Sequence, residues 1–293
     1  MGLDGILLLD KHEGMTSFEA VRKVKMLLGV GKAGHTGTLD KAASGLLIIC
    51  LDRATAIQNL LMGCFKRYRA TLLLGEETDT LDRYGKVIKT EKVPPLTEEI
   101  ILGVLRRFKG KNLQVPPIFS AIHQNGKRLY RRALTGEIVS PNPREIEIRE
   151  LSLLHLEKER IIFEVLASKG TYVRSLGRDI ARSLDTCGYL TELRRLAIGR
   201  FTVEKSLKID EVSDRTQVMP IEEVLSDLPK IVINPERLNG IYAGVPPLKL
   251  IPELDIDTLF PGYYRVISGE RLVAIFTKDE TLRYFRVFRD VKN

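Results

Sequence analysis

The chain has 293 residues, 44% of them hydrophobic and 29% charged, which is the ordinary balance of a globular protein that buries a core. Its length exceeds that of one average domain and predicts about two domains. The 46 basic residues outnumber the 38 acidic ones and give a net charge of +8. This excess favours a polyanionic partner, nucleic acid before a membrane surface, because no polybasic tail or lipidation signal accompanies it.

The cysteine pattern excludes several classes of site. Cys50, Cys64 and Cys187 are widely spaced and form neither a CxxC pair nor a cluster with histidine. We therefore expect buried thiols in a reducing compartment, with no disulfide framework and no metal site. The apolar run at residues 5–9 is too short for a signal-peptide core or a membrane span. Together these features predict a cytoplasmic protein with no membrane attachment.

The N-terminal segment predicts a strand and two helices. Residues 6–9 form an apolar strand, and Thr16 with Glu19 makes a capping box that opens a helix running to about residue 29. Residues 54–65 predict a second helix. The segment 29–34 matches GxGxxG, but it follows a helix instead of a strand, so we reject a dinucleotide site there. No GK[ST] sequence indicates a phosphate loop, so the chain predicts no nucleotide cofactor.

The loop at residues 34–47 places one acidic side chain, Asp40, among glycines and small hydroxyl residues. Glycines permit left-handed turns and the close approach of a ligand, and Thr36 and Thr38 can hold the loop through side-chain hydrogen bonds. Such a loop presents a single reactive group. The alternative is an ordinary connection whose aspartate caps the next element, and the loop alone does not decide between the two.

The middle of the chain predicts one strand and one helix around an acidic loop. Residues 67–75 alternate as a strand does, residues 76–85 form the loop, and residues 96–108 form an amphipathic helix. Within the loop, Asp79 and Asp82 lack the further ligands that a metal would need. We expect these two carboxylates to brace a turn.

A basic stretch follows at residues 120–139, where four cations lie near Tyr130. A solvated charged face is the usual interpretation of such a stretch. The neighbouring aromatic ring favours a loop that contacts RNA, because aromatic side chains stack on exposed bases. The four cations are Lys127, Arg128, Arg131 and Arg132.

The next segment predicts two antiparallel strands, at residues 144–150 and 160–166. Residues 168–176 then lead into a helix that ends near residue 184. Tyr172 and Arg174 are two residues apart, so on a strand their side chains would point the same way.

The C-terminal part changes character. Residues 206–229 are acidic and predict a closing helix pair and a linker. From residue 231 onward, short strands and a hairpin turn at residues 268–270 predict a small β-rich domain. We therefore expect domains at residues 1–229 and 230–293.

Asp40, Tyr68, Tyr172 and Arg174 would make a reactive pocket if the fold brought them together. An arginine beside a carboxylate favours its ionised form and fixes its direction, as a nucleophile requires. Two tyrosines can sandwich a planar ring, and stacking worth about 1–3 kcal/mol per base would offset the cost of extruding a nucleotide. The set suits chemistry on an extruded base. Taken singly, the tyrosines could equally be core residues and the arginine a surface charge.

Residues 34–40 resemble the catalytic motif of the TruB family of tRNA pseudouridine synthases, which isomerise uridine 55 in the T loop of tRNA. Four further segments resemble the family's motifs in the family's order, so the resemblance covers nearly the whole chain. One such match is weak, whereas five in order are specific. The four are the opening motif at residues 9–17, the tyrosine motif at 66–75, the GTYxRSL motif at 170–176 and the LRR motif at 193–195.

The resemblance implies the chemistry. Asp40 would be the nucleophile, attacking either the base or the ribose, and Arg174 would pair with it. Tyr68 would stack on the flipped uracil and help to remove its C5 proton. The glycosidic bond would break, the uracil would turn while held, and C5 would rejoin the ribose. Nothing is added or lost overall, so the resemblance implies that no cofactor is required.

The resemblance also implies how the RNA is bound. Tyr172 and Leu193 would line the base pocket, and His35 would support the flipped T-loop nucleotides. The basic loop at residues 120–139 resembles the thumb insertion of stand-alone bacterial members, which argues against the guide-RNA-dependent relatives. The C-terminal segment resembles a short PUA domain, an RNA-binding β-barrel. The expected partner is the T stem-loop of tRNA, bound by a monomer without guide RNA.

We therefore expect an α/β (α+β) enzyme with a mixed, largely antiparallel sheet flanked by helices, followed by the small barrel. The alternative is a non-catalytic tRNA-binding or RNA-folding protein, and an aspartate facing an arginine favours the enzyme. The chain departs from the family pattern at His12, where the family generally has proline, and at residues 41–42, where Lys41 replaces another proline. These changes predict a freer catalytic loop and a cation that competes with Arg174 for the Asp40 carboxylate.

Overall fold

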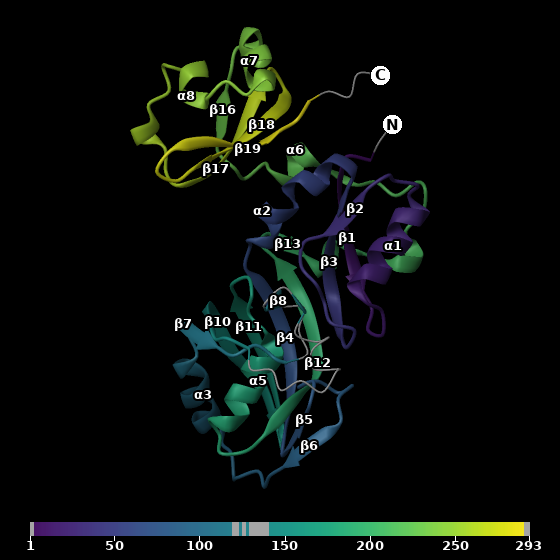
Figure 1. The fold of residues 1–293 in the computed structure, drawn as a ribbon. Helices are drawn as coiled ribbons and strands as arrows, with labels where there is room; N and C mark the ends of the chain where they lie inside the picture. Colours follow the sequence, from purple (N-terminus) through teal and green to yellow (C-terminus); the bar gives the residue numbers. More distant parts are fainter. Residues whose placement is uncertain (1–2, 119–122, 125–126, 129–140, 290–293) are drawn as a thin grey trace.

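The fold was taken from a computed structural model that describes residues 3–118, 123–124, 127–128 and 141–289, the two short pieces by their backbone alone. Two β-sheet units dominate it, a large sheet that forms most of the molecule and a smaller C-terminal sheet at one end (Figure 1). Within the described ranges, no helix is both long and apolar enough to cross a membrane.

The large sheet confirms the prediction of a mixed, largely antiparallel arrangement. Its neighbours pair antiparallel except at two places, where β14 joins β1 and where β12 joins β3. The short strands β2 (Ala33–His35), β13 (Phe201–Thr202) and β15 (Met219–Pro220) attach to its side. In order, the strands are β14 (Leu207–Lys208), β1 (Gly5–Lys11), β3 (Ala43–Leu51), β12 (Gly188–Ile198), β4 (Lys66–Leu74), β11 (Arg160–Ala167), β10 (Arg144–Glu157) and β7 (Gly110–Gln114).

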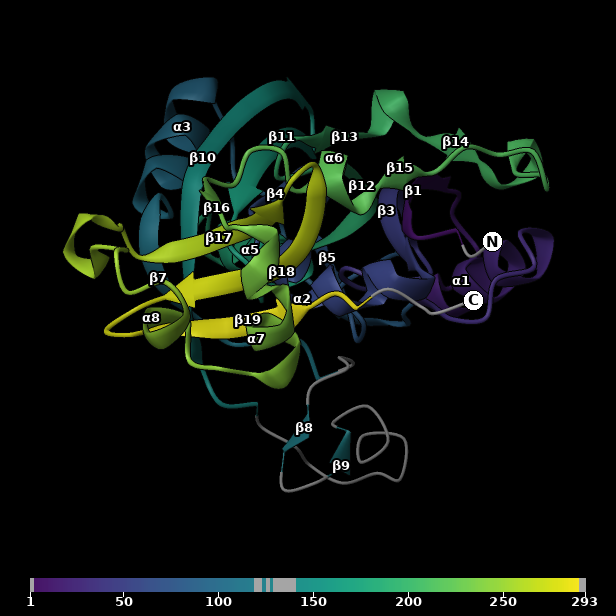
Figure 2. The same cartoon turned by 90° about the horizontal axis from the view of Figure 1, so that it is seen from above.

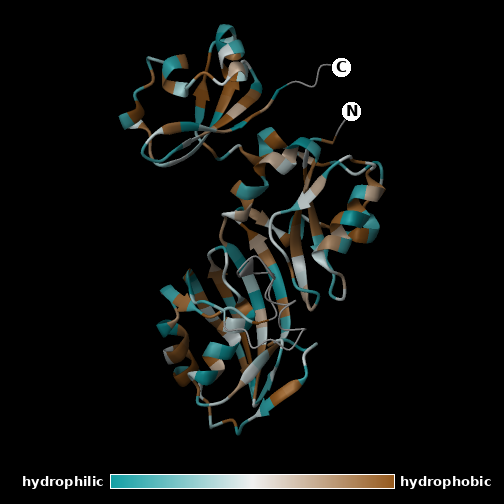
Figure 3. Cartoon of the chain, in the orientation of Figure 1, coloured by the Kyte–Doolittle hydropathy of each residue, from teal (hydrophilic) through white to brown (hydrophobic). Residues whose placement is uncertain are grey.

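Helices flank this sheet, as expected. Helix α1 (Ser17–Leu27) begins with the predicted capping box of Thr16 and Glu19 and packs beside β1 and β3. Helices α3 (Glu98–Arg107) and α5 (Val173–Arg182) cover the strands from β12 to β10 and share one hydrophobic core with them. Figure 3 shows hydrophobic and hydrophilic residues together on α1 and on α3, as amphipathic helices require.

Strands β1 and β3 are buried on both faces. In β1, Ile6 and Leu8 enter one core cluster, whereas Leu7 and Leu9 enter the cluster that includes α1. The continuous apolar run that predicted a buried strand is thus explained by the two-residue period of side chains, which places alternate leucines on opposite faces.

Three predicted segments differ in the structure. The helix expected at 54–65 is a 3-10 turn (Asp52–Ile57) followed by the short α2 (Gln58–Met62), and the acidic loop contains the hairpin of β5 (Glu76–Thr78) and β6 (Val87–Thr90). The helix pair expected at 206–229 is wrong, because only the four-residue α6 (Ile221–Val224) is α-helical there. Both β14 and β15 pair with β1, so the backbone of this segment satisfies a sheet edge instead.

The C-terminal unit is β-rich, as predicted, with a hairpin turn between β17 (Gly262–Ser268) and β18 (Arg271–Lys278). It also contains β16 (Lys230–Val232), β19 (Leu282–Val287) and the short helices α7 (Leu238–Ala243) and α8 (Pro247–Leu250). The four strands form an open sheet in the order β16-β17-β18-β19, so the described residues do not show the expected closed barrel. Figure 2 shows this unit from above, and Figure 1 shows α7 and α8 on its side away from the large sheet.

Little of the basic stretch is described. Only β8 (His123–Gln124) and β9 (Lys127–Arg128) lie within it, and they pair with each other. The predicted RNA-contacting cations Arg131 and Arg132 lie outside the described residues.

Candidate active site

Asp40 lies on the loop between β2 and β3, which are antiparallel neighbours. The hydroxyl of Ser17, at the start of α1, fixes this loop by donating to the Leu39 carbonyl (3.0 Å) and accepting from the Leu39 N–H (2.8 Å). Leu39 is buried, whereas the Asp40 side chain is 39% exposed. The two hydrogen bonds with Ser17 therefore fix the backbone of the loop on its buried side, and the Asp40 carboxylate lies on its exposed side.

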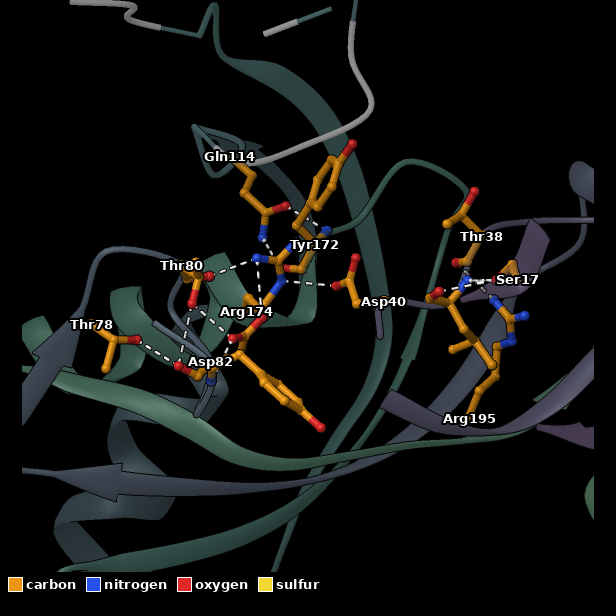
Figure 4. Close-up of polar contacts among 12 residues, drawn as sticks. Ser17, Thr38, Asp40, Thr78, Thr80, Asp82, Gln114, Tyr172, Arg174 and Arg195 are labelled. Carbon is orange, nitrogen blue, oxygen red and sulfur yellow. Dashed lines mark hydrogen bonds and ion pairs between the residues drawn. The ribbon is translucent and has the colours of Figure 1, made fainter. Parts of the chain in front are cut away.

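Arg195 of β12 also stabilises the Asp40 loop, through hydrogen bonds from its side chain. Its guanidinium is buried and donates to the carbonyls of Leu46 (2.7 Å), Gly37 (3.0 Å) and Thr38 (3.5 Å), and Figure 4 shows the contact with Thr38. Gly45, with φ +102°, lies against the Arg195 backbone, where an added Cβ would lie 2.2 Å from the Arg195 carbonyl oxygen. The sequence placed Arg195 in a family motif but gave no signal of this supporting role.

Lys11, at the end of β1, links the loop that follows β1 to the end of the Asp40 loop through hydrogen bonds. Its buried ammonium donates to the carbonyls of His12 (2.9 Å), Met15 (2.8 Å) and Ala43 (2.5 Å). Burial lowers the pKa of Lys11 to about 8, and the nearby negative charge of Asp40 partly opposes this effect.

Arg174 lies between two carboxylates (Figure 4). Its Nε is 2.8 Å from Asp40 Oδ2 and its Nη1 is 3.5 Å from Asp82 Oδ2, while Nη1 also donates to the Thr80 carbonyl at 2.6 Å. The Arg174 side chain is only 6% exposed and comes from the first turn of α5. These three partners fix the plane of the guanidinium and thereby the direction in which it faces Asp40.

Asp82 also belongs to the candidate site, although the sequence predicted only a structural role for it. It braces its turn as expected, accepting from Thr80 Oγ1 (2.7 Å) and from the Tyr84 N–H (3.0 Å), but it also pairs with Arg174. Its partner in that loop, Asp79, accepts from the Lys86 N–H at 2.9 Å, which confirms the bracing role expected of it. No spacing in the sequence signals that α5 brings an arginine to this turn.

Tyr172 does not lie on a strand with Arg174, so the expectation of a shared strand face is wrong. It is the N-cap residue of α5, and Arg174 is already helical. Gln114, at the end of β7, holds the Tyr172 backbone by accepting from its N–H (2.8 Å) and donating to its carbonyl (3.1 Å). This buried glutamine is a second residue that the sequence did not reveal.

A cavity of about 290 Å³ opens beside Asp40. Tyr68 reaches it from β4 and Leu193 from β12, and Tyr172 and Arg174 reach it from the start of α5. The five residues expected around the base therefore line one cavity. The volume of this cavity is at the lower end of the range for small-molecule sites. The cavity can hold a planar ring beside an aspartate that an arginine orients.

Other predicted residues lie elsewhere or differ. His35 does not line this cavity; its Nδ1 accepts from the Gly37 N–H at 3.3 Å, and burial and the charge of Arg195 lower the pKa of His35. Lys41 is exposed and, among the described residues, makes no ion pair with Asp40, so the expected competition with Arg174 is not seen. Lys127 and Arg128 are placed only as the backbone of β9.

No cluster of three or more histidine, cysteine or acidic residues that could hold a metal occurs in the part of the chain that is described. The three cysteines are free thiols. Burial raises the pKa of Cys50 to about 12 and also raises the pKa of Cys64, so neither is activated as a nucleophile.

Comparison with known proteins identifies the family. Residues 25–173 match the model described as the TruB family pseudouridylate synthase (N terminal domain). The tRNA pseudouridine synthase B of Hydrogenovibrio crunogenus is 43% identical over 83% of this chain and 80% of its own length. That of Clostridium kluyveri is 37% identical over 98% of this chain and 100% of its own length.

Solved structures show the same fold. An H/ACA RNP bound to a substrate RNA containing 2′-deoxyuridine contains a chain that matches with a TM-score of 0.71 and 23% identity, over 98% of this chain and 86% of that one. The archaeal box H/ACA sRNP Nop10-Cbf5 complex matches with a TM-score of 0.68 and 23% identity, over 94% and 79% of the two chains. From its sequence, this chain belongs to the TruB family of pseudouridylate synthases and is a pseudouridine synthase.

Proposed function

We propose that this enzyme isomerises uridine 55 in the T loop of tRNA to pseudouridine, with Asp40 as the nucleophile and without a cofactor. The observation that carries the proposal is the 2.8 Å ion pair between Asp40 and Arg174 at the mouth of a ring-sized cavity. The relatives that match nearly the whole chain are named tRNA pseudouridine synthase B, which supports tRNA as the substrate.

In this proposal the chain's own residues hold and attack one nucleotide. Asp40 attacks the base or the ribose as the glycosidic bond from N1 breaks, while the ion pair with Arg174 directs its carboxylate at the cavity. The uracil turns, a new bond forms between C5 and the ribose, and the bond to Asp40 breaks, which restores the free carboxylate. The C5 proton is lost to solvent with help from Tyr68 and N1 gains one, so the atoms balance.

The base pocket would hold the uracil by stacking and packing. Tyr68 stacks on its face, and Tyr172 and Leu193 close the pocket around it. Stacking of about 1–3 kcal/mol per base offsets the few kcal/mol that extrusion from the T loop costs. His35, two residues before the Gly37 turn, would support the neighbouring flipped nucleotides from outside the cavity.

We assign residues 1–229 to the catalytic domain, with the thumb at 120–139, and residues 230–293 to a PUA-like RNA-binding domain. The separate four-stranded sheet and its own apolar core support this division. Lys127, Arg128, Arg131 and Arg132 of the thumb would contact RNA phosphates. The enzyme would act as a monomer, without guide RNA, in the cytoplasm.

The position of the reaction is tested with T-arm RNAs that carry 5-tritiated uridine, because isomerisation must expel the C5 hydrogen. One RNA has uridine at position 55 and its matched control has cytidine there, with all other uridines unchanged. Tritium release from the first RNA alone is the expected result. Equal release from both RNAs would contradict the assignment to position 55, and no release from either, with tight binding, would favour the non-catalytic RNA-binding alternative.

A further inference from the structure

Lys66 lines the active-site cavity, although the reaction described above gives it no role. It begins β4 and is two residues before Tyr68, so both side chains point to the same face of the sheet. The residue is 6% exposed, and its ammonium donates to the carbonyls of Met62 (2.5 Å) and Cys64 (2.7 Å). An ammonium has three donors, and the described residues supply acceptors for two of them.

Three cationic side chains, those of Lys66, Lys169 and Arg195, line the same part of the cavity. Lys169 follows the end of β11, where Ala167 pairs with Lys66, and Lys169 and Arg195 both line the cavity. Burial lowers the pKa of Lys66 to about 8, and the positive charges of Arg195 and Lys169 contribute to this lowering. Across the described ranges, none of these three cations has a carboxylate within ion-pair distance, whereas Arg174 has two.

Two hydroxyl groups in the cavity wall also lack partners. Thr36 is fully buried and Thr171 is half-buried, and in both the Oγ1 atom is shielded from solvent and makes no hydrogen bond to any described residue. Both residues line the cavity. Buried polar atoms are rarely left unsatisfied, so unpaired donors beside unneutralised cations point to an anionic ligand with several acceptor oxygens.

We propose that Lys66, Lys169 and Thr171 bind a backbone phosphate next to the target uridine. This inference rests on the proposed function, since it assumes an RNA substrate in the cavity. Lys66 is about 6–7 Å along β4 from Tyr68, a separation on the scale of one nucleotide. Tyr68 would therefore hold the base while Lys66 holds its phosphate, and the substrate would be fixed at both ends before Asp40 attacks. Lys66 is then a positioning residue.

The test is a double-mutant cycle between the protein and the RNA. T-arm RNAs with tritiated uridine carry a neutral methylphosphonate at the linkage 5′ or 3′ of uridine 55, with diastereomers separated. For the wild type we expect one of these linkages to lower kcat/KM by roughly ten- to a hundredfold, the effect of losing a charge-assisted hydrogen bond. Lys66→Met should lose a similar factor with unmodified RNA, chiefly by raising KM, and should lose little more with the modified RNA.

Two further variants keep the test decisive. Lys169→Met replaces an exposed side chain, so it addresses the same phosphate if Lys66→Met proves unfolded in thermal unfolding. Lys86→Met, at an exposed lysine that does not line the cavity, should retain the full wild-type penalty from the methylphosphonate.

The outcomes separate this inference from the function on which it rests. Loss of the methylphosphonate penalty in Lys66→Met or Lys169→Met supports the phosphate site. The same penalty in the wild type and in both variants would overturn it, as would a wild type that is indifferent to both linkages. Failure of the wild type to release tritium from unmodified RNA would refute the proposed function and, with it, the phosphate site.

Discussion

Replacing Asp82 by asparagine removes the negative charge behind Arg174 while keeping the shape of the side chain. The asparagine oxygen can still accept from Thr80 Oγ1 and from the Tyr84 N–H, so the turn should persist. The atoms that pair are 3.5 Å apart, a distance at which two unit charges attract by about 1 kcal/mol in water and by about 5 kcal/mol at an effective dielectric of 20. This energy range sets the limits for the stabilisation of the Arg174 orientation that is lost when the Asp82 charge is removed.

We expect the single-turnover rate of tritium release to fall by roughly ten- to a hundredfold in Asp82→Asn, equivalent to about 1.4–2.8 kcal/mol. The effect is in the lower half of the range because Arg174 keeps Asp40 and the Thr80 carbonyl as partners. RNA binding, measured by filter retention, should remain within about twofold of the wild type, because Asp82 does not line the base cavity.

Glu150→Gln is the matched control for this variant. It makes the same change from carboxylate to amide at an exposed ion pair, 2.6 Å from Arg67, and should leave the rate unchanged. An Asp82→Asn protein that unfolds at the wild-type temperature and reacts at the wild-type rate would show that the Asp82 charge does not assist catalysis. In that case Arg174 is oriented without Asp82.

Three more predictions address the thumb, the fold and pH. Removing the charges of Arg131 and Arg132 should weaken tRNA binding and reduce the slope of log K against log salt by about 0.7–0.9 for each phosphate that the protein no longer neutralises, and an unchanged slope would mean that these arginines only solvate a surface. Gly45→Ala, at φ +102° against the β12 backbone, should lower the free energy of unfolding by about 2–3 kcal/mol and Tm by roughly 4–12 °C. Its control Gly103→Ala, in open space on α3, should not destabilise the protein. Because the pKa of Lys66 is about 8 in the folded protein and 10.5 ordinarily, its charge disfavours folding at neutral pH. Denaturant titrations should show the stability of the wild type, relative to Lys66→Met, rising between pH 8 and 10.5, and a flat difference would contradict burial of the ammonium.

The parts of the fold that local physics determines could be predicted from the sequence. The capping box of Thr16 and Glu19 begins α1, and Thr97 accepts from the Ile100 N–H at the start of α3. The alternation at residues 67–75 and 160–166 appears as β4 and β11. Asp40 could be predicted as a candidate because a lone acid in a glycine-rich loop is itself a local pattern.

The parts that depend on distant contacts could not be predicted. Asp82 and Gln114 acquire their roles only because α5 brings Arg174 and the Tyr172 backbone to them, and neither has a distinctive neighbourhood in the sequence. Lys66 is indistinguishable from an ordinary strand residue until its burial is known. Residues 206–229 are polar enough for surface helices, yet they pair with the edge strand β1, because an unpaired edge outweighs weak helix propensity.

The most direct test of the central claim compares the wild type with Asp40→Asn in single-turnover tritium release from the T-arm RNA, with RNA affinity measured in parallel. Asparagine keeps the size of the side chain but cannot act as the nucleophile. If Asp40 is the nucleophile, the wild type releases tritium, Asp40→Asn releases none, and the two proteins bind the RNA with similar affinity. Release by Asp40→Asn at the wild-type rate would show that another group carries out the reaction and that Asp40 is not the nucleophile.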